Sequence, residues 1–237
     1  MERLVLVHGS VTNGASTWRA QASLADRYEL VVLDRPGFPP GPTVERVDFD
    51  DDSVWLAALL EPGDHLVGHS YGGVVTLLAA ALRPAAVASL TVIEPPCLDV
   101  ARGDPAIEAF LAGGKKLRAS GPREPEAYLR VFLASVGAPP PPSPLPAALL
   151  AGTLVLMAER PPWEARIPLA ELAAAPFPTL VVSGGHHAAL DAVCDALEAG
   201  IGAQRAVIPG AGHAVQRTGE PFNLLLDAFV RSASTGT

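Results

Sequence analysis

Short continuous apolar runs recur along the chain between longer segments of mixed polarity. Runs of this kind are typical of strands that are buried on both faces of a parallel sheet. They are bounded by glycine, proline and small polar residues, which favour turns. The predicted strands are Leu4–Val7, Tyr28–Leu33, Asp64–Val67, Ser89–Ile93, Phe177–Ser183 and Gln204–Ile208.

Helical segments separate these strands. Asp50, Asp51 and Asp52 fall in the first turn of one of them, where carboxylates favour the helix dipole, so we expect them to be capping residues. Strands that alternate with helices through short linkers indicate an α/β fold with a parallel sheet. The predicted helices are Trp18–Arg27, Phe49–Leu60, Tyr71–Leu82, Ala189–Ala199 and Glu220–Phe229.

The alternation stops between Cys97 and Ala175, where no strand is predicted. Three helices are expected there, at Ile107–Ala119, Glu124–Val136 and Leu145–Glu159, with a stiff proline-rich spacer at 138–146. We therefore predict a core domain formed by residues 1–96 and 176–237, and a helical insertion of residues 97–175 that lies over the sheet.

Net charge, the N-terminal segment and the cysteine spacing limit the kinds of partner and location that are expected. A net charge of −8 and a pI near 5.2 leave no basic stripe to meet phosphates, which argues against nucleic acids and anionic membranes as partners. The apolar run at the N-terminus is too short for a signal peptide or a membrane span, so a cytoplasmic protein is expected. Cys97 and Cys194 have no metal-site spacing and are expected to be buried thiols.

The most informative motif is Gly68-His69-Ser70-Tyr71-Gly72, which follows an apolar strand and precedes a long apolar segment. The two glycines let a strand turn sharply into a helix without a side chain crowding the bend. Ser70 would then lie at a strained, exposed turn with its hydroxyl aimed into a cleft. The motif alone is also compatible with an ordinary glycine-rich turn.

Two further loops give this motif a context: His8-Gly9 after the first strand, and Gly212-His213 after the last. With these loops in this order, the sequence resembles the α/β-hydrolase family over nearly its whole length. The resemblance implies a mostly parallel sheet, a cap inserted after the strand that ends at Ile93, and a Ser–His–acid triad. The family's first two strands usually precede the His-Gly loop and have no counterpart here, so a shortened sheet of about six strands is expected.

The resemblance assigns Ser70 as nucleophile and His213 as its base, because a serine hydroxyl needs a base within hydrogen-bond reach. It also implies an oxyanion hole made by the backbone N–H of Tyr71 and that of Ser10 or Val11. His69 should point away from the cleft. His8 is expected to brace its loop as a hydrogen-bond donor, and the Asp34-Arg35 pair is expected to form a structural salt bridge.

The acid of the triad departs from the family pattern. Its usual position, three residues past Gly184, is occupied by His187, and neither neighbour is a carboxylate. Asp191 is the nearest candidate but should already lie in a helix. Glu94 ends the strand after the predicted nucleophile helix, at the sheet edge where catalytic groups gather, and haloalkane dehalogenases and zearalenone lactonases resemble this arrangement. We predict Glu94 as the acid and Asp191 as the alternative.

The predicted function is hydrolysis of a carboxylic ester or lactone through an acyl-enzyme, without a metal or organic cofactor. The apolar insertion suggests a small, mostly hydrophobic substrate, with Phe132, Met157, Trp163 and His187 as candidate contacts; His186 and His187 could equally occupy a surface turn. A carbon–carbon bond hydrolase or a perhydrolase-type enzyme would use the same triad. The fold also serves as a small-molecule receptor with little turnover.

Overall fold

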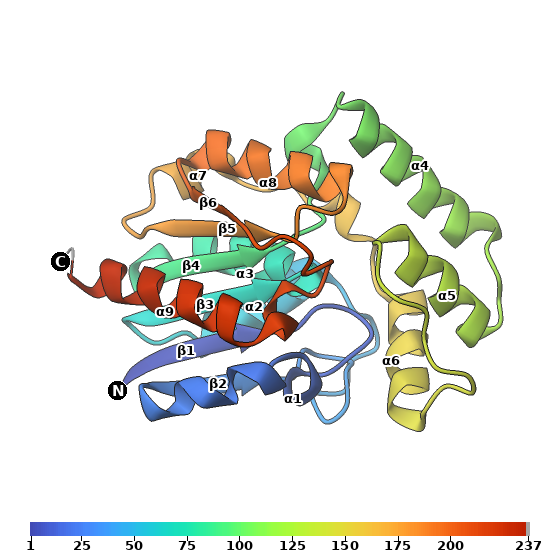
Figure 1. Ribbon diagram of the computed structural model, residues 1–237, viewed down its shortest axis with the longest axis horizontal. Helices are drawn as coiled ribbons and strands as arrows, with labels where there is room; N and C mark the ends of the chain where they lie inside the picture. Colours follow the sequence, from blue (N-terminus) through green and yellow to red (C-terminus); the bar gives the residue numbers. More distant parts are fainter. Residues whose placement is uncertain (236–237) are drawn as a thin grey trace.

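The computed structural model describes residues 1–235 and contains one six-stranded sheet (Figure 1). All neighbouring strands are parallel, in the order β2-β1-β3-β4-β5-β6. The predicted α/β architecture with a parallel sheet of about six strands is thus confirmed. The strands are β1 (Glu2–Val7), β2 (Tyr28–Leu33), β3 (Asp64–His69), β4 (Val87–Ile93), β5 (Thr179–Ser183) and β6 (Gln204–Val207).

Helices cover both faces of the sheet. The α-helices of this layer are α1 (Gly14–Thr17), α2 (Phe49–Leu59), α3 (Tyr71–Leu82), α8 (Ala188–Ile201) and α9 (Glu220–Thr235). The segment predicted as the helix Trp18–Arg27 is instead the 3₁₀ helix η1 (Arg19–Asp26). Further 3₁₀ turns are η2 (Pro84–Ala86) and η5 (Val215–Thr218).

Two apolar clusters hold these helices on the sheet. In β1, Val5 and Val7 face the cluster formed with α2, α3 and α8, whereas Leu4 and Leu6 face the cluster formed with η1 and α9. This alternation is the period of two expected for a strand buried on both faces. Cys97 and Cys194 are buried and free, as predicted.

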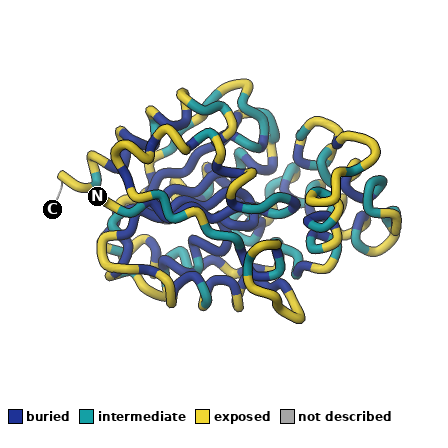
Figure 2. Tube along the Cα trace, turned by 90° about the horizontal axis from the view of Figure 1, so that it is seen from below, coloured by how far each residue is buried: buried dark blue, intermediate teal, exposed yellow. Residues whose placement is uncertain are grey.

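The outer strand β2 corrects one expectation. Its apolar sequence predicts burial on both faces, yet it is only partly buried, and Val32 is 38% exposed. The cause is its position at the edge of the sheet, where one side has no neighbouring strand. Figure 2 shows the same gradient, with the inner strands buried and the outer segments exposed.

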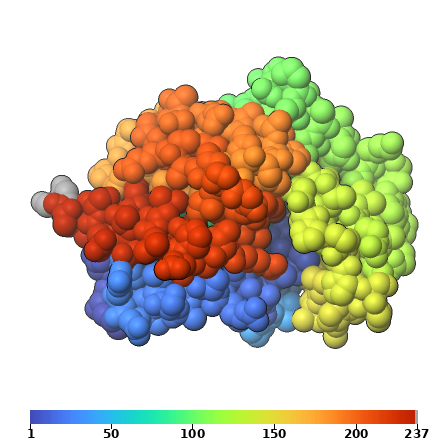
Figure 3. All heavy atoms as spheres, in the orientation of Figure 1, coloured from blue at the N-terminus to red at the C-terminus, as the bar shows by residue number. Residues whose placement is uncertain are grey.

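Residues 97–175 contain helices and no strand, as predicted. The elements are η3 (Leu98–Ala101), α4 (Pro105–Ser120), α5 (Pro125–Ser135), α6 (Ala147–Ala158), η4 (Pro162–Glu164) and α7 (Leu169–Ala173). Helices α4, α5 and α6 lie at one end of the molecule, opposite the start of β1 and the end of α9, whereas α7 lies beside α8 (Figures 1 and 3). Val11 joins Leu117, Tyr128, Leu129 and Leu156 in a separate apolar cluster that attaches this segment to the core.

Within residues 1–235, no helix combines the length and the apolar character needed to cross a membrane.

Candidate active site

Ser70 lies in the sharp turn between β3 and α3, with φ 54° and ψ −123°. This conformation is strained for a residue other than glycine, and the neighbouring glycines make it possible. A Cβ atom on Gly68 would lie 2.5 Å from the carbonyl oxygen of Gly72, and one on Gly72 would lie 2.5 Å from that of Val7. The turn therefore requires glycine at both positions and presents the Ser70 side chain at the C-terminal edge of the sheet.

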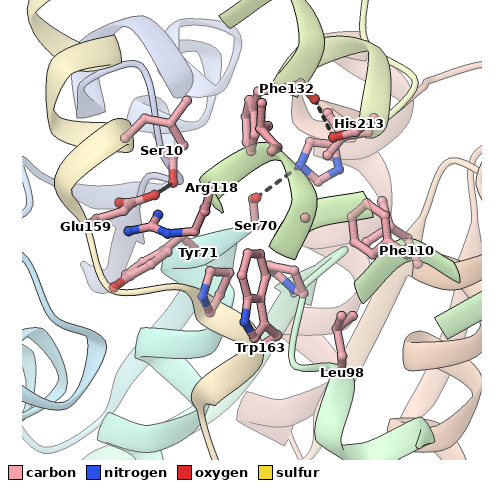
Figure 4. Close-up of a pocket in the computed structure, with 18 of the residues that line it drawn as sticks. Ser10, Ser70, Tyr71, Leu98, Phe110, Arg118, Phe132, Glu159, Trp163 and His213 are labelled. Atoms are coloured by element: carbon pink, nitrogen blue, oxygen red, sulfur yellow. Dashed lines mark hydrogen bonds between the residues drawn. The ribbon is translucent and has the colours of Figure 1, made fainter. Parts of the chain in front are cut away.

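Ser70, His213 and Glu94 form one continuous hydrogen-bonded chain. The Nε2 atom of His213 lies 3.0 Å from Ser70 Oγ, and its Nδ1 atom lies 2.6 Å from Glu94 Oε2. The side chains come from the ends of β3 and β4 and from the loop after β6, which meet at the same edge of the sheet. Figure 4 shows the contact between Ser70 and His213. All three are buried, and Glu94 is 0% exposed.

Both the backbone and the side chain of Glu94 are held by hydrogen bonds. Its N–H donates to the carbonyl of Val182 at 3.0 Å, and its φ of 44° turns the chain away from the sheet. The second carboxylate oxygen, Oε1, accepts a hydrogen bond from the Gly184 N–H at 2.8 Å and lies 3.4 Å from His186 Nδ1. Glu94 is therefore buried, and both of its carboxylate oxygens have partners at this edge of the sheet.

Asp191, the alternative acid, has other partners. Its Oδ1 accepts hydrogen bonds from Ser183 Oγ at 2.5 Å and from Arg205 Nη2 at 3.2 Å. It lies in the first turn of α8, as the sequence suggested. Its interactions join α8 to β5 and β6 and do not include His213.

The side chain of His69 supports the loop that carries His213. The Nε2 atom of His69 lies 3.0 Å from the backbone oxygen of His213, and the two rings are 4.9 Å apart. Burial lowers the pKa of His69 well below its ordinary value, so the ring is neutral and donates to this carbonyl. His69 does not line the cavity beside Ser70, in agreement with the prediction that it points away from the cleft.

His8 braces the loop after β1. Its Nδ1 atom donates to the Gly9 carbonyl at 2.7 Å, and its Nε2 atom accepts from the Arg35 N–H at 2.9 Å. Burial and the nearby Arg35 lower the pKa of His8 to about 3, which keeps the ring neutral. The predicted bracing role is confirmed, and it places Ser10 next to Ser70.

The candidate oxyanion donors differ in position. Tyr71 is the first residue of α3, so its N–H has no intrahelical acceptor. Ser10 lines the cavity that contains Ser70, whereas Val11 lines a separate pocket beside α6. The carbonyl of Val11 is in close contact with Gly152 of α6, which leaves no room for a Cβ atom at that position.

A cluster of buried charged side chains lies close to the site. Arg35 is completely buried and contacts Asp52 Oδ2 at 2.9 Å and Glu159 Oε2 at 3.6 Å. The predicted structural salt bridge is thus present for Arg35, while Asp34 accepts from the Gly14 N–H at 2.7 Å.

The predicted capping role of the acidic residues in the first turn of α2 needs a correction. The capping residue of α2 is Asp48, which accepts from the N–H of Asp50. Asp52 was expected to be a cap, but it is the buried partner of Arg35. Sequence position alone could not distinguish the two roles, because both occur within one helical turn.

The cavity beside Ser70 has a volume of about 70 Å³ and apolar walls from the 97–175 segment. Phe132 and Trp163 line it, as proposed from the sequence, together with Leu98, Phe110 and Leu156. Met157 lines a different, outer pocket, and His187 lines none of the cavity, since its Nε2 atom is bound to the Ser135 carbonyl at 3.0 Å. His186 is bound in the same way to the Val136 carbonyl.

Sequence reasoning missed two charged residues in the cavity wall, Arg118 and Glu159. Both are contributed by the 97–175 segment, one by α4 and the other by the residue that ends α6. Neither belongs to a motif, and only the packing of the helices brings them beside Ser10 (Figure 4). Among residues 1–235, no group of three histidine, cysteine or acidic side chains is arranged to hold a metal ion.

The family is decided by a match to residues 4–223 of a model described as "Alpha/beta hydrolase family". The chain belongs to the alpha/beta hydrolase family. The crystal structure of NosK from Streptomyces actuosus has the same fold, with 26% identity, a TM-score of 0.61 and 98% of each chain covered.

Several curated relatives carry the same printed name, pimeloyl-[acyl-carrier protein] methyl ester esterase. The Aeromonas hydrophila protein is 38% identical over 99 residues, 40% of this chain and 38% of that protein. The Methylococcus capsulatus protein is 34% identical over 171 residues, 63% of each. The matches span between 32% and 63% of the lengths of the curated relatives.

Proposed function

We propose that this protein is a serine hydrolase that cleaves a carboxylic ester or lactone of a small, mostly hydrophobic substrate. The observation that carries the proposal is the unbroken chain from Ser70 Oγ through His213 to Glu94, with distances of 3.0 Å and 2.6 Å. A nucleophile, a base and a group that orients the base form the arrangement that acyl transfer requires. The printed names of the curated relatives agree with ester cleavage.

In the proposed reaction, Ser70 Oγ attacks the carbonyl carbon while His213 Nε2 takes its proton. The resulting imidazolium gives that proton to the leaving alkoxide, and the acyl group stays on Ser70. Glu94 accepts the hydrogen bond from His213 Nδ1, which fixes the tautomer with a free Nε2 lone pair and stabilises the positive ring. Water then attacks the acyl-enzyme with His213 again as the base.

The negative oxygen of the tetrahedral intermediate would be stabilised by two backbone N–H groups. Tyr71 supplies one, at the N-terminus of α3, where the helix dipole also favours negative charge. Ser10 is the better second donor, because it lines the cavity with Ser70 and Val11 does not. We place the oxyanion hole between Tyr71 and Ser10.

The 97–175 segment would act as a cap that selects the substrate. It supplies most of the apolar residues around the cavity, including Phe110, Phe132 and Trp163. Because these side chains form the cavity walls, they would limit the size and shape of the acyl or alcohol group beside Ser70.

The proposal is tested by Ser70→Ala. The variant should lose turnover of p-nitrophenyl esters and of a lactone panel by a factor on the order of 10⁶, and it should lose labelling by a fluorophosphonate probe. Ligand binding without labelling of the native protein would indicate a receptor. Cleavage of a β-diketone in preference to every ester and lactone would indicate a carbon–carbon bond hydrolase.

A further inference from the structure

One wall of the otherwise apolar cavity is polar. Glu159 ends α6 and is buried, with 2% of its surface exposed, and it lines the same cavity as Ser70. Its Oε1 atom accepts a short hydrogen bond from the hydroxyl of Ser10. Figure 4 shows Ser10, Glu159 and Arg118 together on one side of Ser70, with Phe110 on the other.

The second oxygen of Glu159 has no hydrogen-bond partner, although it is buried. Arg35 Nη2 lies 3.6 Å from this oxygen, too far for a hydrogen bond. The same nitrogen lies closer to Asp52, at 2.9 Å from its Oδ2 atom, and likewise makes no hydrogen bond. A buried carboxylate oxygen that accepts no hydrogen bond is costly. A donor from a bound ligand would remove this cost.

Arg118 is the cation on the cavity side. It extends from α4, is half-buried, and lines both the cavity with Ser70 and the outer pocket that contains Arg123 and Met157. Among the described residues no carboxylate forms an ion pair or hydrogen bond with it. It acts on Glu159 electrostatically, in the direction that lowers the pKa of the carboxyl group.

We infer that Glu159 and Arg118 form a subsite for a neutral substrate group that both donates and accepts hydrogen bonds, with a carboxamide as the simplest example. The amide N–H would donate to Glu159 Oε2, and the amide oxygen would accept from the Arg118 guanidinium. The inference rests on the proposed function, because the rest of the same substrate would place its ester carbonyl at Ser70.

Charge balance favours a neutral group over an ion. Arg35, Asp52, Glu159 and Arg118 carry equal numbers of positive and negative charges when all are ionised, which requires a pH above the raised pKa of Glu159, about 7. A carboxylate would meet Arg118 but would face Glu159, and an ammonium group would meet Glu159 but would face Arg118. A carboxamide satisfies both side chains without adding charge to a site of low polarity.

The test compares esters of equal length whose far end is a methyl group, a carboxamide, a carboxylate or an ammonium group. Hydrogen bonds to charged groups predict that the native protein prefers the carboxamide ester over the methyl-ended ester by about tenfold or more in kcat/KM. A site built for a polar group rejects the analogue that lacks it, because its own polar atoms are then unpaired.

Two variants test whether the carboxamide preference depends on Arg118 and Glu159. Arg118→Met removes the donor, and Glu159→Gln keeps an acceptor for Ser10 while an amide nitrogen replaces Oε2. Each should reduce the carboxamide preference severalfold or more. Arg130→Met and Glu126→Gln remove a partly exposed ion pair on α5, outside the cavity, and serve as matched controls that leave the carboxamide preference unchanged.

The outcomes separate this inference from the proposed function. Ser70-dependent turnover with no carboxamide preference, or with a carboxylate preference lost only in Arg118→Met, overturns the subsite. If turnover does not depend on Ser70, the proposed function fails. The subsite is then judged by calorimetric binding of the carboxamide ester to Ser70→Ala, where binding weakened by Arg118→Met and by Glu159→Gln supports it and equal binding of the methyl-ended ester overturns it.

Discussion

Glu94 and His213 are joined across the edge of the sheet by a 2.6 Å contact between Oε2 and Nδ1. The acidic partner of the histidine therefore comes from the end of β4. The loop after β5, where the family usually carries the acid, contributes the Gly184 N–H that binds the other oxygen of Glu94. The nearby carboxylate on α8, Asp191, is occupied by Ser183 and Arg205.

This arrangement predicts opposite results for two substitutions of similar size. Glu94→Gln should lower kcat for p-nitrophenyl ester hydrolysis by a factor on the order of 10⁴, because an amide can hold His213 in the wrong tautomer. Asp191→Asn should leave kcat within about twofold and reduce only stability, because a hydrogen bond contributes about 1 kcal/mol. The reverse result would assign the acid to α8.

The members of this hydrogen-bonded chain could be predicted from sequence because the resemblance to the family suggests their roles and each follows a recognisable strand. Ser70 follows β3, Glu94 follows β4, and His213 lies on a small-residue loop after β6. In a parallel sheet these ends meet at one edge, so order along the chain is enough to bring the side chains together. The position where the family usually carries the acid is occupied by His187, which favours Glu94 at the end of the neighbouring strand.

The remaining features depend on contacts that no local pattern records. Arg118 and Glu159 reach the cavity only because α4 and α6 pack against the loop after β1. Asp52 looks like a capping residue until Arg35, from the end of β2, is placed beside it. The apolar sequence of β2 likewise does not reveal that this strand lies at the edge of the sheet.

The turn at Ser70 gives a second prediction. Gly72→Ala places a Cβ atom 2.5 Å from the Val7 carbonyl oxygen, so α3 or β1 must shift. Overpacking of this kind typically costs about 1 to 3 kcal/mol, and the shift should also lower kcat by moving Ser70 relative to His213. Urea unfolding and ester kinetics measure the two effects.

Gly113→Ala is the matched control for that substitution. Gly113 lies within α4, and a Cβ atom there meets nothing within 4 Å. Replacement of glycine by alanine in a helix should stabilise the protein by about 0.5 to 1 kcal/mol without changing kcat. Equal effects of the two variants would contradict the steric account of the turn at Ser70.

A third prediction concerns the pH dependence of stability. Burial raises the pKa of Glu159 from 4.5 to about 7, with Asp52 adding to the effect and Arg35, Ser10 and Arg118 opposing it. The folded state then holds this proton more tightly than the unfolded state. The stabilisation is complete below about pH 4.5 and is lost as the pH rises through about 7.

Glu159→Gln removes this dependence. The difference between about 7 and 4.5 corresponds to about 3 kcal/mol. The free energy of unfolding of the variant, relative to the native protein, should therefore rise by up to that amount between about pH 4.5 and about pH 8. Urea titrations at several pH values measure this change, with Glu126→Gln, at a partly exposed carboxylate on α5, as control. Parallel curves for Glu159→Gln and the native protein would contradict the prediction.

The apolar wall of the cavity gives the last prediction. Trp163 lines the cavity and packs so closely on α4 that a Cβ atom on Gly114 would lie 2.7 Å from its ring. Trp163→Ala should enlarge the cavity and move the preferred p-nitrophenyl ester to a longer acyl chain, with kcat/KM for long chains rising about tenfold relative to short ones. Leu154→Ala, on the same segment but 53% exposed and outside the cavity, should leave the chain-length profile unchanged. A profile that stays the same in Trp163→Ala, while its kcat on the shortest ester is preserved, would show that this part of the 97–175 segment does not select the substrate.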